Sequence, residues 1–209
     1  YPAQSEALSK IDSVSVMSHY INEAVAWEMQ GARAKADALL DKIARINDGK
    51  SAEVIGTNPE YRLRAVQIAT WRGDYARAKA LLAYQGGSFG ASAKYPAVFD
   101  EEFVALNVAA ADLLALSGDL SGAVSTIDQT RTFFDRHAKA ADYPFLAAML
   151  RATAGRIALR RGDATACLAL TAEALELQRQ YHAPAGFWIK QTSRDRANCA
   201  GTGRGSQPS

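Results

Sequence analysis

The sequence predicts an all-α protein made of about four antiparallel helical hairpins stacked side by side. Three observations lead to this prediction. A Gly-Asp pair follows an apolar helical stretch at Gly73, Gly118 and Gly162, and a weaker copy of the turn lies at Gly31. These four glycines are 42, 45 and 44 residues apart, close to a fixed period. The chain is also rich in alanine, leucine and arginine, which have high helix propensities.

Each Gly-Asp pair has a physical role at the turn of a hairpin. Glycine just after a helix adopts the left-handed conformation that other residues resist. Asp74, Asp119 and Asp163 come directly after these glycines, where a carboxylate can accept hydrogen bonds from the first amides of the next helix. We therefore expect each pair to end one helix and begin another.

The hairpins are expected over residues 5–46, 59–85, 99–136 and 142–182, all within one repeat domain of residues 1–190. The first helix should begin near residues 4–6, and Asn58-Pro59 should cap the third. Residues 86–96 form a glycine-rich connection that could present amides to phosphate. It lacks the Lys-Ser/Thr ending of a P-loop, so we expect a plain loop. Its aromatic residues Phe89 and Tyr95 could cover a groove.

The C-terminal part changes in character after the fourth hairpin. Phe187, Trp188 and Ile189 should cover the apolar end of that hairpin, and residues 191–209 should form a polar, flexible tail. We expect Cys167 and Cys199 to stay unpaired. A bridge would require the tail to fold back, and reducing compartments tolerate few disulfides.

Four residues of the second hairpin match the second half of the tetratricopeptide pattern. Gly73 ends a helix, Tyr75 supplies an aromatic two residues later, and Ala78 and Leu82 follow at the small and large apolar positions. The chain therefore resembles a divergent tetratricopeptide (TPR) array. The resemblance implies a right-handed α-solenoid whose first helices line a concave groove. The same offsets recur in Gly118, Leu120, Ala123 and Ile127 and, more weakly, in Gly162, Ala164, Cys167 and Thr171.

Two features depart from that family. The spacing of the turn glycines exceeds the family period of about 34 residues. Arg62, Asn107 and Arg151 stand where an aromatic residue is expected early in the first helix of a hairpin. Another kind of helical-hairpin solenoid therefore stays open.

Composition and motifs exclude several function classes. The formal net charge is +2, so no strong field favours nucleic acid or an anionic membrane. No apolar run is long enough to span a bilayer. His19, His137 and His182 lie far apart, and no catalytic or metal-ligand motif occurs, so we expect no catalytic residue, metal or cofactor. Tyr1 begins the chain without a signal-peptide pattern, so a processed product and a fragment are both open, as is the compartment, with the cytoplasm favoured.

The resemblance places a peptide-binding groove along the first helices of the hairpins. Arginine can bind a carboxylate, while glutamine and asparagine can bond a peptide backbone. The alternative is that the arginines are solvated surface charges and that Trp71 belongs to the core. Aligning the hairpins on their turn glycines gives the candidate groove residues Asn22, Arg64, Gln67, Trp71, Asp112, Thr153, Arg156 and Arg160.

These observations favour a non-enzymatic module that binds a protein or peptide, as a scaffold or sensor in a regulatory protein. The Ala/Arg-rich composition points to a bacterial source. One alternative is a domain that senses a small molecule or short peptide and controls an attached effector. Another is a helical accessory domain of an enzyme, with a site near residues 86–96.

Overall fold

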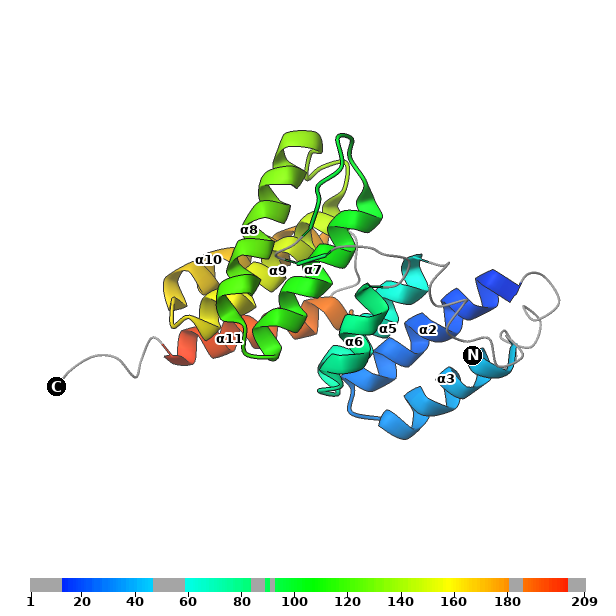
Figure 1. The fold of residues 1–209 in the computed structure, drawn as a ribbon. Helices are drawn as coiled ribbons and strands as arrows, with labels where there is room; N and C mark the ends of the chain where they lie inside the picture. Colours follow the sequence, from blue (N-terminus) through cyan, green and yellow to red (C-terminus); the bar gives the residue numbers. More distant parts are fainter. Residues whose placement is uncertain (1–12, 47–58, 84–88, 91–92, 181–185, 203–209) are drawn as a thin grey trace. The chain divides into compact units, whose positions relative to one another are not determined.

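The computed structural model describes residues 13–46, 59–83, 89–90, 93–180 and 186–202 (Figure 1). Every regular element in these ranges is a helix, as the sequence predicts. The chain divides into two compact units, Tyr1–Gly87 (unit 1) and Ser88–Ser209 (unit 2). Within the described ranges, no helix combines the length and apolarity needed to cross a membrane.

In the part that the structure describes, unit 1 has two helical hairpins. The first pairs α2 (Ser13–Met29) with α3 (Arg33–Ile46), and the second pairs α5 (Pro59–Trp71) with α6 (Tyr75–Leu82). The two first helices, α2 and α5, also lie against each other. The expected helix start near residues 4–6 and the Asn58 cap lie outside the described residues.

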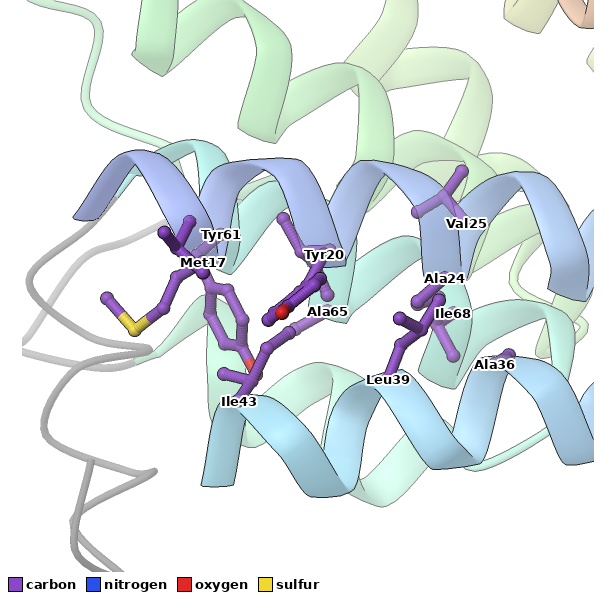
Figure 2. Close-up of a cluster of buried hydrophobic side chains, with 12 residues drawn as sticks. Met17, Tyr20, Ala24, Val25, Ala36, Leu39, Ile43, Tyr61, Ala65 and Ile68 are labelled. Atoms are coloured by element: carbon purple, nitrogen blue, oxygen red, sulfur yellow. The ribbon is translucent and has the colours of Figure 1, made fainter. Parts of the chain in front are cut away.

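The core of unit 1 is apolar and draws on α2, α3 and α5. Figure 2 shows this cluster, with the side chains of all three helices meeting between their axes. Its members recur every three or four residues along each helix, which is the spacing of one helical face. The buried residues include Met17, Tyr20, Ala24, Val25, Ala36, Leu39, Ile43, Tyr61, Ala65 and Ile68.

The described residues of unit 2 form two hairpins and one more helix. Helices α7 (Glu101–Leu116) and α8 (Leu120–His137) form one hairpin, and α9 (Pro144–Arg160) and α10 (Ala164–Arg179) form the next. Helix α9 packs against α10, α7, α8 and α11 (Phe187–Thr202). It is therefore the central element of this unit.

The turns have the predicted chemistry. Gly31, Gly73, Gly118 and Gly162 all have positive φ. The side chain of Asp119 accepts a hydrogen bond from the Gly122 amide at 2.8 Å, and Asp74 and Asp163 cap their helices in the same way. The residues five positions after the turn glycines, Ala36, Ala78, Ala123 and Cys167, are all 0% exposed.

The glycine-rich connection is used for packing in its described part. Asn107 stands where the tetratricopeptide pattern expects an aromatic residue, and it is 0% exposed. Its Oδ1 accepts the Gly90 amide at 3.0 Å, and its Nδ2 donates to the Phe103 carbonyl at 2.9 Å. The Gly90 amide is thus engaged by the fold rather than presented to an anion. Phe89 and Tyr95 both pack against Phe103.

The expectation of a flexible tail is wrong for the described residues beyond position 190. Residues up to Thr202 belong to α11, and residues 203–209 lie outside the described part. The expectation about the cysteines is also wrong, because Cys167 of α10 and Cys199 of α11 form a disulfide. Their Cα atoms are 5.9 Å apart, within the usual range for such a bridge. Helix α11 brings Cys199 back onto α10, which is the fold-back that the bridge requires.

Candidate functional site

The candidate groove residues fall into two groups, one in each unit. They lie on α2 and α5 in unit 1 and on α7 and α9 in unit 2, and the two helices of each pair are in contact. Six of the eight candidates engage one another through hydrogen bonds or ion pairs. The six are Asn22, Arg64, Gln67, Asp112, Thr153 and Arg156.

The group in unit 1, here the Asn22 network, consists of Asn22, Glu60, Arg64 and Gln67. Arg64 Nε donates to Asn22 Oδ1 at 2.9 Å, and its Nη1 donates to Gln67 Oε1 at 3.1 Å. Asn22 Nδ2 donates to Glu60 Oε1 at 2.8 Å. Burial lowers the pKa of the Arg64 guanidinium below its ordinary value, while the charge of Glu60 acts in the opposite direction. Arg64 therefore organises the surface between α2 and α5.

The group in unit 2, here the Arg156 cluster, consists of Asp112, Thr153, Arg156 and Asp195. Arg156 Nε lies 3.1 Å from Asp112 Oδ1, and its Nη1 lies 3.4 Å from Asp195 Oδ2. Its Nη2 donates to Thr153 Oγ1 at 2.8 Å. One guanidinium thus joins α7, α9 and α11.

Burial and the neighbouring charges both shift the pKa values of Arg156 and Asp195. Burial lowers the pKa of the Arg156 guanidinium, but the carboxylates of Asp112 and Asp195 outweigh that effect and raise it above its ordinary value. Burial raises the pKa of Asp195, although Arg156 and a hydrogen bond from Gln191 oppose the rise. Two carboxylates share one guanidinium, so the cluster has an excess of negative charge when both are ionised.

Trp71 and Arg160 lie outside these two groups. Trp71 is partly buried and packs against the apolar cluster of unit 1, which agrees with the alternative that it belongs to the core. Arg160 is exposed, one helical turn after Arg156 on α9.

Three residues that the sequence did not predict take part in these contacts, namely Glu60, Gln191 and Asp195. Glu60 follows Pro59 in the first turn of α5, where the helix dipole alone explains an acidic residue. Asp195 and Gln191 lie in the segment that was expected to be flexible. A signal was present there, because Ile189, Thr192, Asp195 and Cys199 are spaced by three or four residues, as on one face of a helix.

Unit 1 has another charged group, which joins its two hairpins near their turns. Arg72, next to the turn glycine of the second hairpin, donates from Nε to Glu28 Oε2 at 3.0 Å and from Nη1 to Asp37 Oδ1 at 2.7 Å. Arg33 Nε lies 3.4 Å from Glu28 Oε1. The Glu28 side chain is only 3% exposed, so its charge is balanced within the fold. We assign this group a structural role.

An open depression of about 400 Å³ lies between α8 and Tyr95. Tyr95 stands on its wall, with its hydroxyl 3.0 Å from Thr130 Oγ1, and its ring packs against Phe133. The depression combines aromatic surface with one acidic and one basic side chain. Its lining residues are Tyr95, Asp128, Gln129, Thr132, Phe133 and Arg136.

The two described histidines lie in separate settings. His19 Nε2 lies 3.9 Å from Glu23 Oε2 on the surface of α2, and His137 packs on the ring of Phe133. His182 lies outside the described residues. No group of three or more potential metal ligands occurs in the described part of the chain.

Comparison with protein-family models, with curated proteins and with solved structures finds no match for this chain.

Proposed function

We propose that this chain is a non-enzymatic helical-repeat module that binds a protein or an extended peptide, as a scaffold or sensor. The proposal rests on how the first helices of neighbouring hairpins are paired within each unit. Paired helices of this kind build extended surfaces with side chains at repeating positions.

One observation carries the proposal. Asn22 and Arg64, which touch, each lie nine residues before a turn glycine, Gly31 and Gly73. In unit 2, Asp112 and Arg156 touch, and each lies six residues before its turn glycine, Gly118 or Gly162. Within each unit, equivalent positions of the two neighbouring hairpins therefore meet, which supports a polar surface on each unit.

Each of these two surfaces, taken by itself, has side chains that can bind an extended peptide. On unit 2, the exposed guanidinium of Arg160 can form two parallel hydrogen bonds with an acidic group of the peptide. On unit 1, the partly buried amide of Gln67 can bond a peptide backbone, whereas the Asn22 amide is engaged by Ser18, Glu60 and Arg64. The buried guanidinium of Arg64 holds these amides in place, which lowers the entropy cost of binding.

A selection experiment tests this function. The full chain is immobilised and used to enrich a displayed random peptide library, and an enriched peptide is then titrated by fluorescence anisotropy. Arg160→Ala should weaken binding three- to tenfold, since it removes a charge-assisted hydrogen bond worth about 1 kcal/mol. Arg131→Ala is the matched control, because Arg131 is an exposed arginine on the second helix of its hairpin. Equal affinities of the two variants, or no enrichment at all, would contradict the proposal.

The depression on α8 supports ligand sensing as a second candidate. Its volume of about 400 Å³ falls within the range of small-molecule sites. A ligand that binds only the native state raises the melting temperature, so a panel of aromatic acids, amines and dipeptides can be screened by thermal shift. The shift should disappear in Arg136→Ala if the depression is the site. A panel without any shift would count against this candidate.

A further inference from the structure

Helix α11 packs against α10 and α9 of unit 2 through one face. Ile189 is its main buried aliphatic side chain, and Trp188 packs edge-on against Phe145. Thr192 accepts a hydrogen bond from Gln178 Nε2 at 3.1 Å. Most of the remaining surface of α11 is polar and exposed, including Lys190, Arg194 and Arg196.

Two other contacts on this face link α11 to the proposed binding surface. Cys199, 0% exposed, is bridged to Cys167 of α10. Asp195, one turn earlier on α11, reaches Arg156 of α9 at 3.4 Å. The disulfide therefore holds in place the helix whose carboxylate occupies part of the Arg156 guanidinium.

We propose that the Cys167–Cys199 disulfide is a redox-controlled latch that decides whether α11 covers the Arg156 cluster. In the oxidised state the bridge keeps the two helix faces at high effective concentration, so α11 stays docked. In the reduced state the non-covalent contacts of this face, among them those of Thr192 and Asp195, no longer hold α11, and Asp195 leaves Arg156. Arg156 then retains Asp112 and Thr153, with its Nη1 group available to a carboxylate of a partner.

The chemical step is thiol–disulfide exchange with a dithiol. One thiolate of the dithiol attacks a sulfur of the bridge, forming a mixed disulfide and releasing a cysteine thiolate. The second thiol of the reductant then displaces the other cysteine and closes its own disulfide. The bridge gains two electrons and two protons, and the dithiol loses them. Both cysteines are 0% exposed, so attack on the bridge requires a transient opening of α11.

The opened state also uncovers apolar surface. The bridge lies among Ala158, Leu159, Ala166, Leu168 and Leu170, which pack around the two cysteines. Undocking of α11 exposes this patch on α9 and α10 next to the freed guanidinium. The reduced protein thus presents a basic group beside an apolar surface, which fits a peptide with an acidic residue and an apolar neighbour.

Limited trypsin digestion of the full chain tests the latch without any ligand. Cleavage after Lys190, Arg194 and Arg196 reports α11, while cleavage after Arg131 and Arg136 reports α8 as an internal reference. When opening is faster than cleavage, the cleavage rate follows the population of the open state. Reduction of the folded wild-type protein with dithiothreitol should raise cleavage in α11 at least tenfold and leave cleavage in α8 unchanged.

Two variants complete the design. Cys167→Ser/Cys199→Ser should show the fast α11 cleavage with or without dithiothreitol. Asp195→Asn, with the bridge intact, should keep α11 protected. Equal protection of α11 from cleavage before and after reduction overturns the latch. An equal rise of the cleavage rates in α8 and α11 also overturns it, because the bridge would then stabilise the whole unit.

The expected effect of the latch on peptide binding rests on the proposed function, and it is measured in a separate experiment. A peptide enriched as described above should bind the reduced protein more tightly than the oxidised one, by about tenfold for one freed charged hydrogen bond. Lack of any enriched peptide would contradict the proposed function, whereas digestion alone decides the latch. The two failures are therefore distinguishable.

Discussion

Replacement of Gly155 by alanine tests the packing of α9 on α10 most directly. Local preference alone favours alanine, since glycine within a helix costs about 1 kcal/mol relative to alanine. A Cβ at Gly155 would lie 2.9 Å from Thr171 Cγ2, where an ordinary contact begins at 3.4 Å. The two helices or the threonine must therefore move by about 0.5 Å, the difference of these distances.

Thr171 has little freedom to move away. It is 0% exposed, and its hydroxyl donates to the Cys167 carbonyl at 2.7 Å. Overpacking a core by one methyl group typically costs about 1–3 kcal/mol. Subtracting the gain in helix propensity leaves an expected net destabilisation by Gly155→Ala of about 1 kcal/mol.

A double-mutant cycle with Thr171→Ser isolates the clash. Serine keeps the hydroxyl but lacks Cγ2, so Gly155→Ala should stabilise the Thr171→Ser background by up to about 1 kcal/mol. The coupling between the two substitutions is then about 2 kcal/mol. Gly201→Ala on α11 is the matched control, because a Cβ there meets no atom within 4 Å.

The measurement combines two methods. Denaturant unfolding followed by far-UV circular dichroism gives the overall free energy, and hydrogen exchange of α9 and α10 amides gives the local one. The free energies from hydrogen exchange of α9 and α10 are needed because the chain has two compact units that can unfold separately. Stabilisation by Gly155→Ala alone, or additivity of the cycle within about 0.5 kcal/mol, would refute the close approach of α9 to α10.

Three further predictions concern caps, turns and pH. Asp119→Ala should lower the free energy of unfolding by about 1 kcal/mol, since it removes the acceptor of the Gly122 amide, while Asp119→Asn should change it little in denaturant titrations. Gly162→Ala should lower the free energy of unfolding by roughly 1–2 kcal/mol through backbone strain alone, because φ is +79° and a Cβ meets nothing within 4 Å. Gly162→Asn should lower the free energy of unfolding by less, since asparagine tolerates this conformation better. Burial raises the folded-state pKa of Asp195, so the folded state binds more protons there than the unfolded state. Its contribution to stability should fall as pH rises from its ordinary pKa through the raised one, and Asp195→Asn should remove that slope from pH-dependent unfolding curves. An unchanged slope in Asp195→Asn would contradict the assignment.

The turns show how far local rules reach in this chain. A positive φ at glycine and a carboxylate that accepts an amide three residues later depend only on neighbouring residues. The buried small residues five positions after each turn glycine follow from helical periodicity. For these reasons the described helices and their pairing within hairpins agree closely with the sequence prediction, while the solenoid arrangement stays a prediction.

The candidate site shows where local rules end. The alignment on turn glycines identified helices that do lie side by side, and it included Asn22, Arg64 and Arg156. It did not show that Arg64 binds Asn22 or that Arg156 binds Asp112, since these partners are 42 and 44 positions apart in the sequence. Trp71 has the same helical pattern whether it faces a ligand or the core, and only packing separates the two roles.

The sequence by itself determined the helices, their turns and the small residues that let paired helices approach, because these features depend on backbone conformation and on contacts within one or two turns. Only the tertiary structure decided that α11 folds back onto α10, that Cys199 meets Cys167, and that Asp195 shares Arg156 with Asp112. Each of these contacts joins residues more than 30 positions apart. Their formation depends on how whole helices pack. A mostly polar helix with one buried face shows only a weak hydrophobic periodicity in the sequence.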